Sequence, residues 1–251
     1  IDEDGLRKEV VIKRIPKNEE WRNELNVLKT LKGTSKKLIN FLDYYESERC
    51  SYIITDLYEG FDLFEHIDIN VPYPENYAKQ LIKEMLVCIK ECHDKKIAHL
   101  DIKCENYMVR KVIPPQLILI DFGHAEKIDH ATMKHGQFSY GTCFYLCPEG
   151  YNKYFSMKSD SWSIGICAHL LLTGGYPFIG DDDDEYAENV CKGNIKISPK
   201  LSPGALKFIK GSLHYDPALR SDIYQMLDTP WLTNTEKSVT MYITIEKQIK
   251  N

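Results

Sequence analysis

The chain has 251 residues, of which 43% are hydrophobic and 27% are charged, a balance typical of a globular protein that can bury a sizeable core. Its formal net charge of −5 gives no electrostatic footprint for nucleic acid or for an anionic membrane surface. The sequence contains no apolar run of about eighteen residues, so no membrane span is expected, and its charged first residues predict no signal peptide.

Residues 9–57 have the pattern of a small sheet with one helix. Residues 9–15 are rich in β-branched side chains and predict a strand, and further strands are expected around 38–46 and 51–56. Between them, residues 18–31 place a tryptophan and three leucines on one face at helical spacing. This part is therefore expected to be mostly β.

The longer part that follows has a helical pattern. Pro74 suits a first helical turn, and apolar residues recur at helical spacing from Ala78 to Cys92. Short strands are expected at 107–109 and 117–120. Serines at 202 and 221 mark expected helix starts. The remaining predicted helices cover 158–173, 184–192, 203–213 and 221–228.

These patterns predict an α+β protein with a small β-rich lobe and a larger α-helical lobe. The change of pattern near 57–61 divides the chain into an N-terminal lobe at 1–57 and a C-terminal lobe at 58–234. Residues 235–251 mix apolar and charged side chains and are expected to form a tail. The tail could lie on the helical lobe, lead into a regulatory segment or be a plain linker.

Eight cysteines are scattered along the chain, and none belongs to a recognisable metal-binding set. Cys88 and Cys92 are spaced as neighbours on a helix, and Cys143 and Cys147 fall in a loop. No second pair and no pair of histidines completes a zinc site. We therefore expect free thiols in a reducing, cytoplasmic environment.

The segment IAHLDIKCENYMV, residues 97–109, is dense in acid, base and amide side chains directly before a predicted strand. Its pattern His-x-Asp-x-Lys-x-x-Asn would arise by chance about once in a thousand such chains. Further on, LILIDFG places an acid directly after an apolar strand. The residues that carry these two motifs are His99, Asp101, Lys103, Asn106 and Asp121.

The two motifs resemble the catalytic loop and the metal-binding motif of the protein kinase family. Other landmarks of that family follow in the same order. They are Lys13 in VVIK, Glu24 in NELNVLKTL, Glu149 in GTCFYLCPE, Asp160 in SDSWSIGI and Arg220 in DPALRSDI. The resemblance extends over about residues 9–232 and implies a bilobal kinase-like fold with ATP bound in the cleft between the lobes.

The resemblance also implies a role for each residue in phosphoryl transfer, which depends on positioning and charge neutralisation. Asp121 and Asn106 would bind Mg²⁺, because both offer the oxygen ligands that this ion prefers. Lys13 would hold the ATP phosphates and Glu24 would hold Lys13. Asp101 would accept or orient the proton of the substrate hydroxyl. Lys103, two residues on, would neutralise charge on the transferred group.

The hinge between the lobes is expected to contact the nucleotide. The adenine edge would meet the backbone of Asp56, Leu57 and Tyr58, since this is the extended segment between the lobes. Thr55 would then be a small gatekeeper that admits bulky inhibitors. The family likewise predicts an ion pair between Glu149 and Arg220 that ties the activation segment to the helical lobe.

The position of Lys103 in the motif resembles serine/threonine kinases, as does Thr142 near the end of the activation segment. The segments YIITDLYEGFDLFEHI, TGGYPF and MLDTPWL resemble the calmodulin-dependent and calcium-dependent kinase group. Basophilic members of that group bind substrate arginine with carboxylates at the positions of Asp62 and Glu105. A planar guanidinium can pair with a carboxylate through two hydrogen bonds, so basic protein substrates are expected. The alternative for these two residues is a solvated rim with some ribose contact.

Four features depart from the family pattern. No G-x-G-x-x-G segment precedes Lys13, so either the sequence begins after the first two strands or the protein lacks that phosphate lid. Glu24 follows Lys13 by only eleven residues. Leu100 replaces the arginine that normally pairs with an activation-loop phosphate. Cys147 replaces a small alanine, and we expect this change to have little effect.

Two classes of function follow. The first is an active serine/threonine kinase that uses ATP and Mg²⁺, which retention of the six catalytic positions favours. The second is a pseudokinase that acts as a nucleotide-binding or scaffold module, which Leu100 and the missing glycine-rich segment favour.

Overall fold

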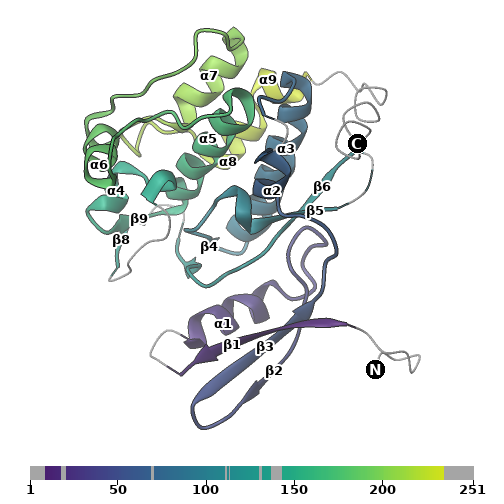
Figure 1. The fold of residues 1–251 in the computed structure, drawn as a ribbon. Coiled ribbons are helices and arrows are strands. Elements are labelled where there is room, and N and C mark those ends of the chain that lie inside the picture. The colour runs from purple at the N-terminus through teal and green to yellow at the C-terminus, as the bar shows by residue number, and fades with distance from the viewer. Residues whose placement is uncertain are drawn as a thin grey trace.

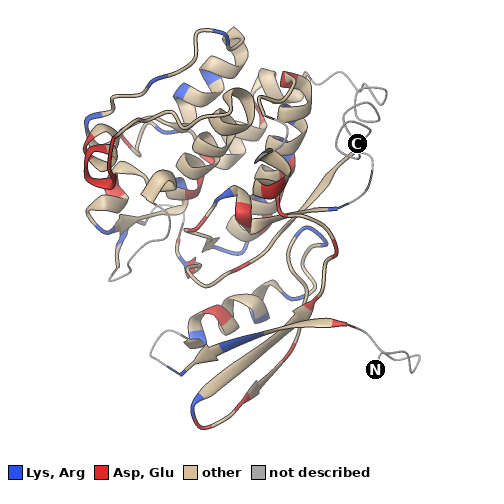
Figure 2. Cartoon of the chain, in the orientation of Figure 1, with Lys and Arg blue, Asp and Glu red and all other residues tan. Residues whose placement is uncertain are grey.

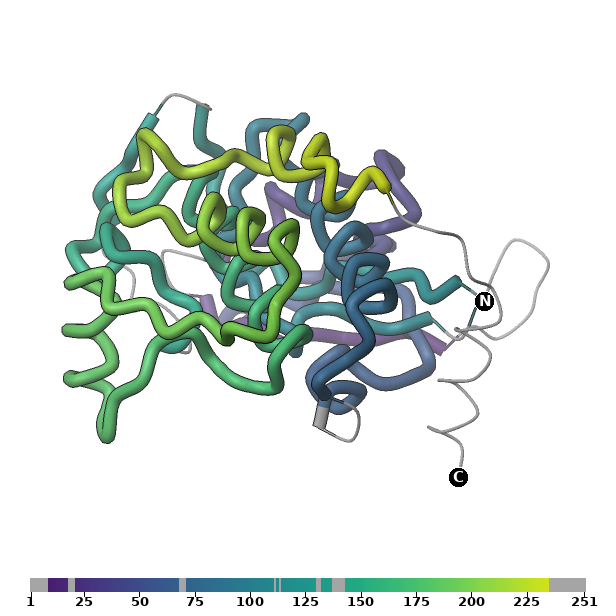
Figure 3. Tube along the Cα trace, turned by 90° about the horizontal axis from the view of Figure 1, so that it is seen from above, coloured from purple at the N-terminus to yellow at the C-terminus, as the bar shows by residue number. Residues whose placement is uncertain are grey.

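The computed structural model describes residues 9–17, 21–68, 71–110, 112, 114–129, 132–136 and 143–234. A small lobe of three strands and one helix lies below a larger, mostly helical lobe (Figure 1). The predicted α+β, bilobal, kinase-like fold is confirmed. Seen from above, the helices of the large lobe cover the strands of the small lobe (Figure 3). The expected tail at 235–251 lies outside the described residues, and the domain boundaries stay predictions.

The small lobe is an antiparallel sheet in the order β1-β3-β2, with one helix packed on it. Its strands are β1 (Val10–Pro16), β2 (Phe41–Glu46) and β3 (Cys50–Asp56). The helix α1 (Trp21–Leu31) forms where the sequence predicts one, because its apolar side chains fall on a single face. It buries Trp21, Leu25, Val27, Leu28 and Leu31.

The large lobe is built from helices with three short strand pairs. The helices are α2 (Leu63–Asp68), α3 (Glu75–His93), α4 (Pro148–Tyr151), α5 (Met157–Thr173), α6 (Asp183–Lys192), α7 (Pro203–Ser212), α8 (Ile223–Leu227) and α9 (Pro230–Thr233). The antiparallel pairs are β4 (Ile97–Ala98) with β7 (Glu126–Lys127), β5 (Tyr107–Arg110) with β6 (Gln116–Leu119), and β8 (Lys134–His135) with β9 (Tyr154–Phe155).

Helix α5 runs through the core, and most of its side chains are buried, including those of Ser159, Asp160 and His169. The hydroxyl of Ser156 accepts from the backbone of Lys158, and the side chain of Ser159 completes a capping box at the N-terminus. The helix ends at Gly174, which adopts a left-handed conformation. Gly165 allows α7 to approach closely, because a Cβ atom there would lie 2.4 Å from the Ser212 hydroxyl.

The lobes meet through backbone contacts beside the hairpin of β5 and β6. The amide of Ile39 donates to the carbonyl of Leu119 at 2.9 Å, and the amide of Leu119 donates to the carbonyl of Lys37 at 2.9 Å. Acidic and basic residues are spread over both lobes, with a cluster of acidic residues at the start of α6 (Figure 2). The two backbone hydrogen bonds between the lobes fix the relative position of the two halves of the candidate site.

The structure differs from the sequence prediction in its short elements. Helix α8 does not begin at Ser221, because the Asp222 side chain caps it by accepting from the amide of Gln225. The sequence did not predict α2, α4 and α9, which are six residues or fewer. All eight cysteines are free thiols, as predicted. Within the described part of the chain, every helix is too short or too polar to cross a membrane.

Candidate active site

Three polar side chains meet in the loop between β4 and β5. The Lys103 ammonium donates to Asp101 Oδ2 at 2.8 Å. The Asn106 amide Nδ2 donates to the Asp101 backbone oxygen at 2.7 Å and to Asp101 Oδ2 at 3.0 Å. These bonds hold one carboxylate oxygen of Asp101 beside the Lys103 cation and the Asn106 amide. The three predicted residues therefore form one cluster.

A fully buried carboxylate holds this loop in place. Asp160, in the first turn of α5, accepts from the backbone N–H groups of His99 and Leu100, each at 2.8 Å. Its Oδ2 atom also lies 2.8 Å from Nε2 of His93. Leu100 has a left-handed φ of 64°, which is unfavourable for a residue with a Cβ atom. The two charge-assisted bonds to Asp160 offset that strain and orient the next residue, Asp101.

A second cluster joins the two lobes. The Lys13 ammonium on β1 lies 2.9 Å from Oε1 of Glu24 on α1 and 2.7 Å from Oδ1 of Asp121 in the large lobe. Partial burial alone would lower the pKa of Lys13, but the two carboxylates outweigh it and raise that pKa above its usual value. The spacing of eleven residues between Lys13 and Glu24 therefore does not prevent their pairing.

The pKa values of the two carboxylates in this cluster, Glu24 and Asp121, are shifted in opposite directions. Burial raises the pKa of Glu24, and the nearby Lys13 only partly opposes it. Burial would also raise the pKa of Asp121, but Lys13 and the Gly123 amide lower it below its usual range. Asp121 is thus held as a carboxylate, and its left-handed φ of 58° points to a constrained backbone.

The second cluster borders a cavity of about 330 Å³ between the lobes. Lys13, Glu24, Thr55 and Asp121 line it together with apolar side chains, which are Val11, Leu28, Ile39, Ile53, Ile120 and Phe122. The predicted position of Thr55 at the cleft between the lobes is confirmed. This cavity combines apolar walls with a few charged groups, as pockets for small ligands do.

The side chains of the hinge residues Asp56 and Tyr58 do not line the cavity beside Lys13. Asp56 and Tyr58 line a separate hollow with Lys36 and Arg110. The Asp56 carboxylate accepts from the Asn40 side chain at 2.9 Å, and the Asp56 amide donates to the Asn40 carbonyl at 3.1 Å. The side chains of Asp56 and Tyr58 are therefore not brought to the cavity beside Lys13.

The oxygen donors expected for a metal fit a hard divalent cation. Asp121 is held ionised by Lys13. The hydrogen bonds of Asn106 run through its Nδ2 atom, which orients the amide and leaves the carbonyl oxygen as its acceptor. Carboxylate and amide oxygens are ligands that Mg²⁺ prefers. Among the described residues, no group of three or more His, Cys, Asp or Glu side chains forms another metal site.

The two predicted arginine-binding carboxylates lie in different environments. Asp62 caps α2 by accepting from the Glu65 amide at 2.8 Å. Glu105 is half-buried, and its Oε2 atom has no hydrogen-bond partner among the described residues. Burial raises the pKa of Glu105, and the neighbouring Asp62 adds to this effect. A buried carboxyl oxygen without a partner is unfavourable, so the Glu105 side chain favours a cationic partner.

Aromatic side chains that the sequence did not single out lie near Glu105. Tyr176 stacks on Phe144, with ring centroids 5.0 Å apart, and its hydroxyl lies 3.4 Å from that of Tyr145. Burial raises the pKa of Tyr176, and the carboxyl of Glu105 raises it further. The signal for this group was the aromatic content of CFYLC and GGYPF, but only the fold brings the two segments together.

The end of the activation segment is tied to the large lobe by a buried ion pair. Arg220 Nη1 donates to Glu149 Oε1 at 2.6 Å, and Nη2 donates to Oε2 at 2.8 Å. The Arg220 side chain is 0% exposed, and its Nε donates to the His214 carbonyl. The predicted pair is confirmed and is bidentate.

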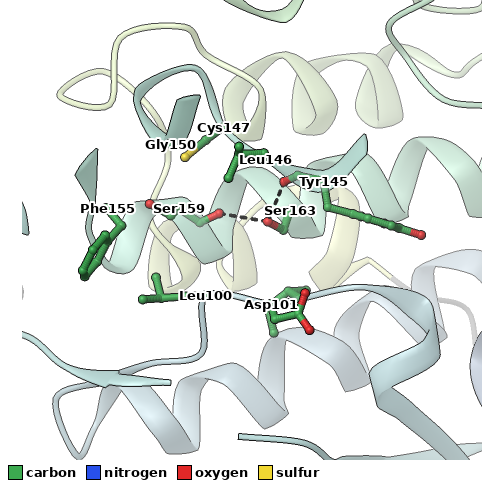
Figure 4. Close-up of a pocket in the computed structure, with 10 residues that line it drawn as sticks. Leu100, Asp101, Tyr145, Leu146, Cys147, Gly150, Phe155, Ser159 and Ser163 are labelled. Carbon is green, nitrogen blue, oxygen red and sulfur yellow. Dashed lines mark hydrogen bonds between the residues drawn. The ribbon is translucent and has the colours of Figure 1, made fainter. Parts of the chain in front are cut away.

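A narrow pocket lies between Asp101 and this anchored segment (Figure 4). Leu100 and Asp101 form one side, and the segment that includes Leu146 and Cys147 forms the other. Burial raises the pKa of the Cys147 thiol to about 12, so it acts here as a small apolar group. Thr142, together with Ser139 and Tyr140, lies outside the described residues.

Leu100 takes part in an apolar cluster where the family carries an arginine. Its side chain packs against Ala98, Ile128, Phe155 and Met157, all of them buried. Figure 4 shows Leu100 facing the region of Phe155. Residues of this kind offer no hydrogen-bond donor to a phosphate group.

Comparisons with known proteins agree with this geometry. Residues 4–232 match the model of the protein kinase domain family. The chain is 32% identical over 237 residues to calcium-dependent protein kinase 6 of Plasmodium berghei (strain Anka), covering 91% of this chain and 16% of that protein. It is 32% identical over 257 residues to CDPK-related kinase 8 of Arabidopsis thaliana, covering 96% of this chain and 42% of that protein.

A third relative is similar at a lower identity. The chain is 29% identical over 218 residues to death-associated protein kinase dapk-1 of Caenorhabditis elegans, which covers 85% of this chain and 15% of that protein. The chain thus spans less than half the length of these curated relatives.

Proposed function

Because the chain belongs to the protein kinase domain family, we propose that it transfers the γ-phosphate of ATP to a serine or threonine hydroxyl of a protein substrate. One observation carries this proposal. Lys13 bridges Glu24 and Asp121 at the same cavity between the lobes, and the loop with Asp101, Lys103 and Asn106 is held in a defined geometry nearby. Phosphoryl transfer requires this kind of charge arrangement.

Asp101 acts on the substrate hydroxyl in this proposal. Its Oδ2 atom accepts from Lys103 and Asn106, which fixes the direction of the carboxylate. The hydroxyl of a bound substrate would donate to Asp101, which orients the attacking oxygen and takes up its proton. Lys103 then supplies positive charge near the transferred group.

Lys13, Asp121 and Asn106 hold the nucleotide phosphates and the metal. Lys13 would leave Asp121 to pair with phosphate oxygens while Glu24 keeps it oriented. Asp121 and Asn106 would bind Mg²⁺, which neutralises charge on the phosphates when bound. The adenine would lie against the apolar walls near Thr55 and use backbone groups of Asp56 and Tyr58, since their side chains face another hollow.

Basic protein substrates fit the acceptor side of the site. A substrate guanidinium would donate to the half-buried side chain of Glu105 and to the nearby carboxylate of Asp62. Asp62 retains one carboxylate oxygen beyond the one that caps α2. The eight free thiols support a reducing, cytoplasmic environment for this reaction.

The test is transfer of label from [γ-³²P]ATP to a serine peptide with arginine before the acceptor, measured on the full-length protein. We expect transfer that requires Mg²⁺ and that Asp121→Asn abolishes, because this variant removes the charge of a metal ligand. A protein that binds nucleotide but gives no transfer under any of these conditions would be a pseudokinase and would contradict the proposal.

A further inference from the structure

The activation segment, residues 121–149, contains an ion pair. Its later partner is a cation and its earlier partner is an acid, which is the reverse of a phosphate on the segment that binds an arginine before it. Lys134, on β8, lies 3.8 Å from Oε2 of Glu126, on β7. The same ammonium donates to the backbone carbonyl of Lys127 at 2.6 Å. The cation therefore lies on β8, further along the segment, and the acid lies on β7, closer to its start.

Glu126 also faces the small lobe. Its Oε1 atom lies 3.5 Å from the Nδ2 atom of Asn23 on α1, and this nitrogen also donates to the Ala125 carbonyl at 2.6 Å. Asn23 directly precedes Glu24, which orients Lys13 in the cavity. The two oxygens of Glu126 thus join the activation segment on one side to the helix that positions Lys13 on the other.

Among the described residues, Glu126 lies beside an apolar cluster and not beside an arginine that could bind a phosphate. In the antiparallel pair of β4 and β7, Glu126 lies opposite Ala98. Ala98 and Leu100 belong to one apolar cluster, which offers no cation. A phosphate on the segment would meet the like charge of Glu126 and would compete with it for Lys134.

We propose that Asn23, Glu126 and Lys134, here called the Glu126 clamp, hold the activation segment and α1 in the catalytic arrangement without phosphorylation. The three act as positioning residues, because they contact each other and the backbone of residues 125–127, and Asn23 directly precedes Glu24 on α1. The inference rests on the proposed kinase activity for one of its readouts. The Glu126 side chain is only 20% exposed, so its charge is less screened than that of a surface pair.

The experiment is a charge swap on the full-length protein. Glu126→Lys and Lys134→Glu are each expected to lower kcat/KM about fivefold, the effect of losing one well-placed ion pair. Both should also speed hydrogen exchange of the amides in β8 and β9. The double variant restores opposite charges and should return both readouts to within about twofold of the wild type, which a purely structural loss would not do.

Two controls keep the outcome interpretable. Lys207→Glu changes net charge as Lys134→Glu does, at an exposed position on α7, and should leave both readouts unchanged. Glu126→Gln keeps the side-chain shape if the lysine variant fails to fold, and it should change both readouts in the same direction by less.

Single variants that match the wild type, or a double variant whose defects add, would overturn the clamp. A wild type without transfer activity would defeat the proposed function, while hydrogen exchange would still test the clamp.

Discussion

Glu105 differs from the other carboxylates of the site because one of its oxygens is buried without a hydrogen-bond partner among the described residues. Burial raises its pKa, which means that the neutral form persists to higher pH than for an exposed glutamate. A guanidinium needs the ionised form. The proposed binding of substrate arginine at Glu105 should therefore be complete above the raised pKa and be lost as the pH falls through it.

This gives a prediction for substrate selection. On acidification through the raised pKa of Glu105, KM for an arginine-containing serine peptide should rise, whereas KM for the same peptide with alanine should change little. Glu105→Gln should remove this difference and lower the preference for arginine about tenfold, because a charge-assisted hydrogen bond is lost. Steady-state kinetics with both peptides over a pH series provides the measurement. An arginine preference that is the same at every pH and in the variant would rule out this role.

At the scale of elements, the ion pair of Glu149 and Arg220 joins the start of α4 to the segment before α8. Removal of one partner leaves a buried charge, so Arg220→Ala should lower the free energy of unfolding by about 3–5 kcal/mol. Urea denaturation followed by tryptophan fluorescence measures this change, since Trp162 lies 5.0 Å from the guanidinium. The matched control is Lys192→Ala, which breaks an exposed pair with Glu188 and should cost less than about 0.5 kcal/mol. Equal effects of the two substitutions would contradict a structural role for the buried pair.

The long helices could be predicted from the sequence, and so could the short strands β5 and β6, but three short helices could not. Helices α3 and α5 have enough turns for their apolar pattern and caps to be decisive. Helices α2, α4 and α9 contain too few residues to show a period, and tertiary contacts determine them. The predicted start of α8 at 221 was wrong by two residues, because the helix begins at Ile223 and only the fold selects Asp222 over Ser221 as its cap.

The same distinction applies to the candidate site. Motif spacing was enough to bring together Asp101, Lys103 and Asn106, since the first and the last are only five positions apart. Lys13 and Asp121 were joined only through the resemblance to a family, because 108 residues separate them. The side-chain directions of Asp56 and Tyr58, and the meeting of Phe144 with Tyr176, depend on tertiary packing that no local pattern encodes.

For the whole molecule, the apolar surroundings of Leu100 predict how strongly activity depends on phosphorylation. Because Leu100 and its neighbours offer no cation, removal of phosphate should change the activity of the full-length protein by less than about twofold. Phosphatase-treated and untreated protein are compared, each with and without residues 235–251, since we expect control to come from flanking sequence. A large loss on dephosphorylation alone that maps to a residue in 132–142 would refute this expectation.

The central claim, that the assembled clusters catalyse phosphoryl transfer, is tested most directly by Asp101→Asn. This substitution keeps the side-chain shape and removes the group proposed to accept the hydroxyl proton, at a distance from the nucleotide cavity lined by Lys13 and Thr55. Turnover of the serine peptide and the Kd for ATP are measured on the same full-length preparations. We predict that kcat falls by about 10²–10⁴-fold, the usual contribution of a general base, while the Kd for ATP stays within about twofold. A variant that transfers phosphate at the wild-type rate would contradict the assignment.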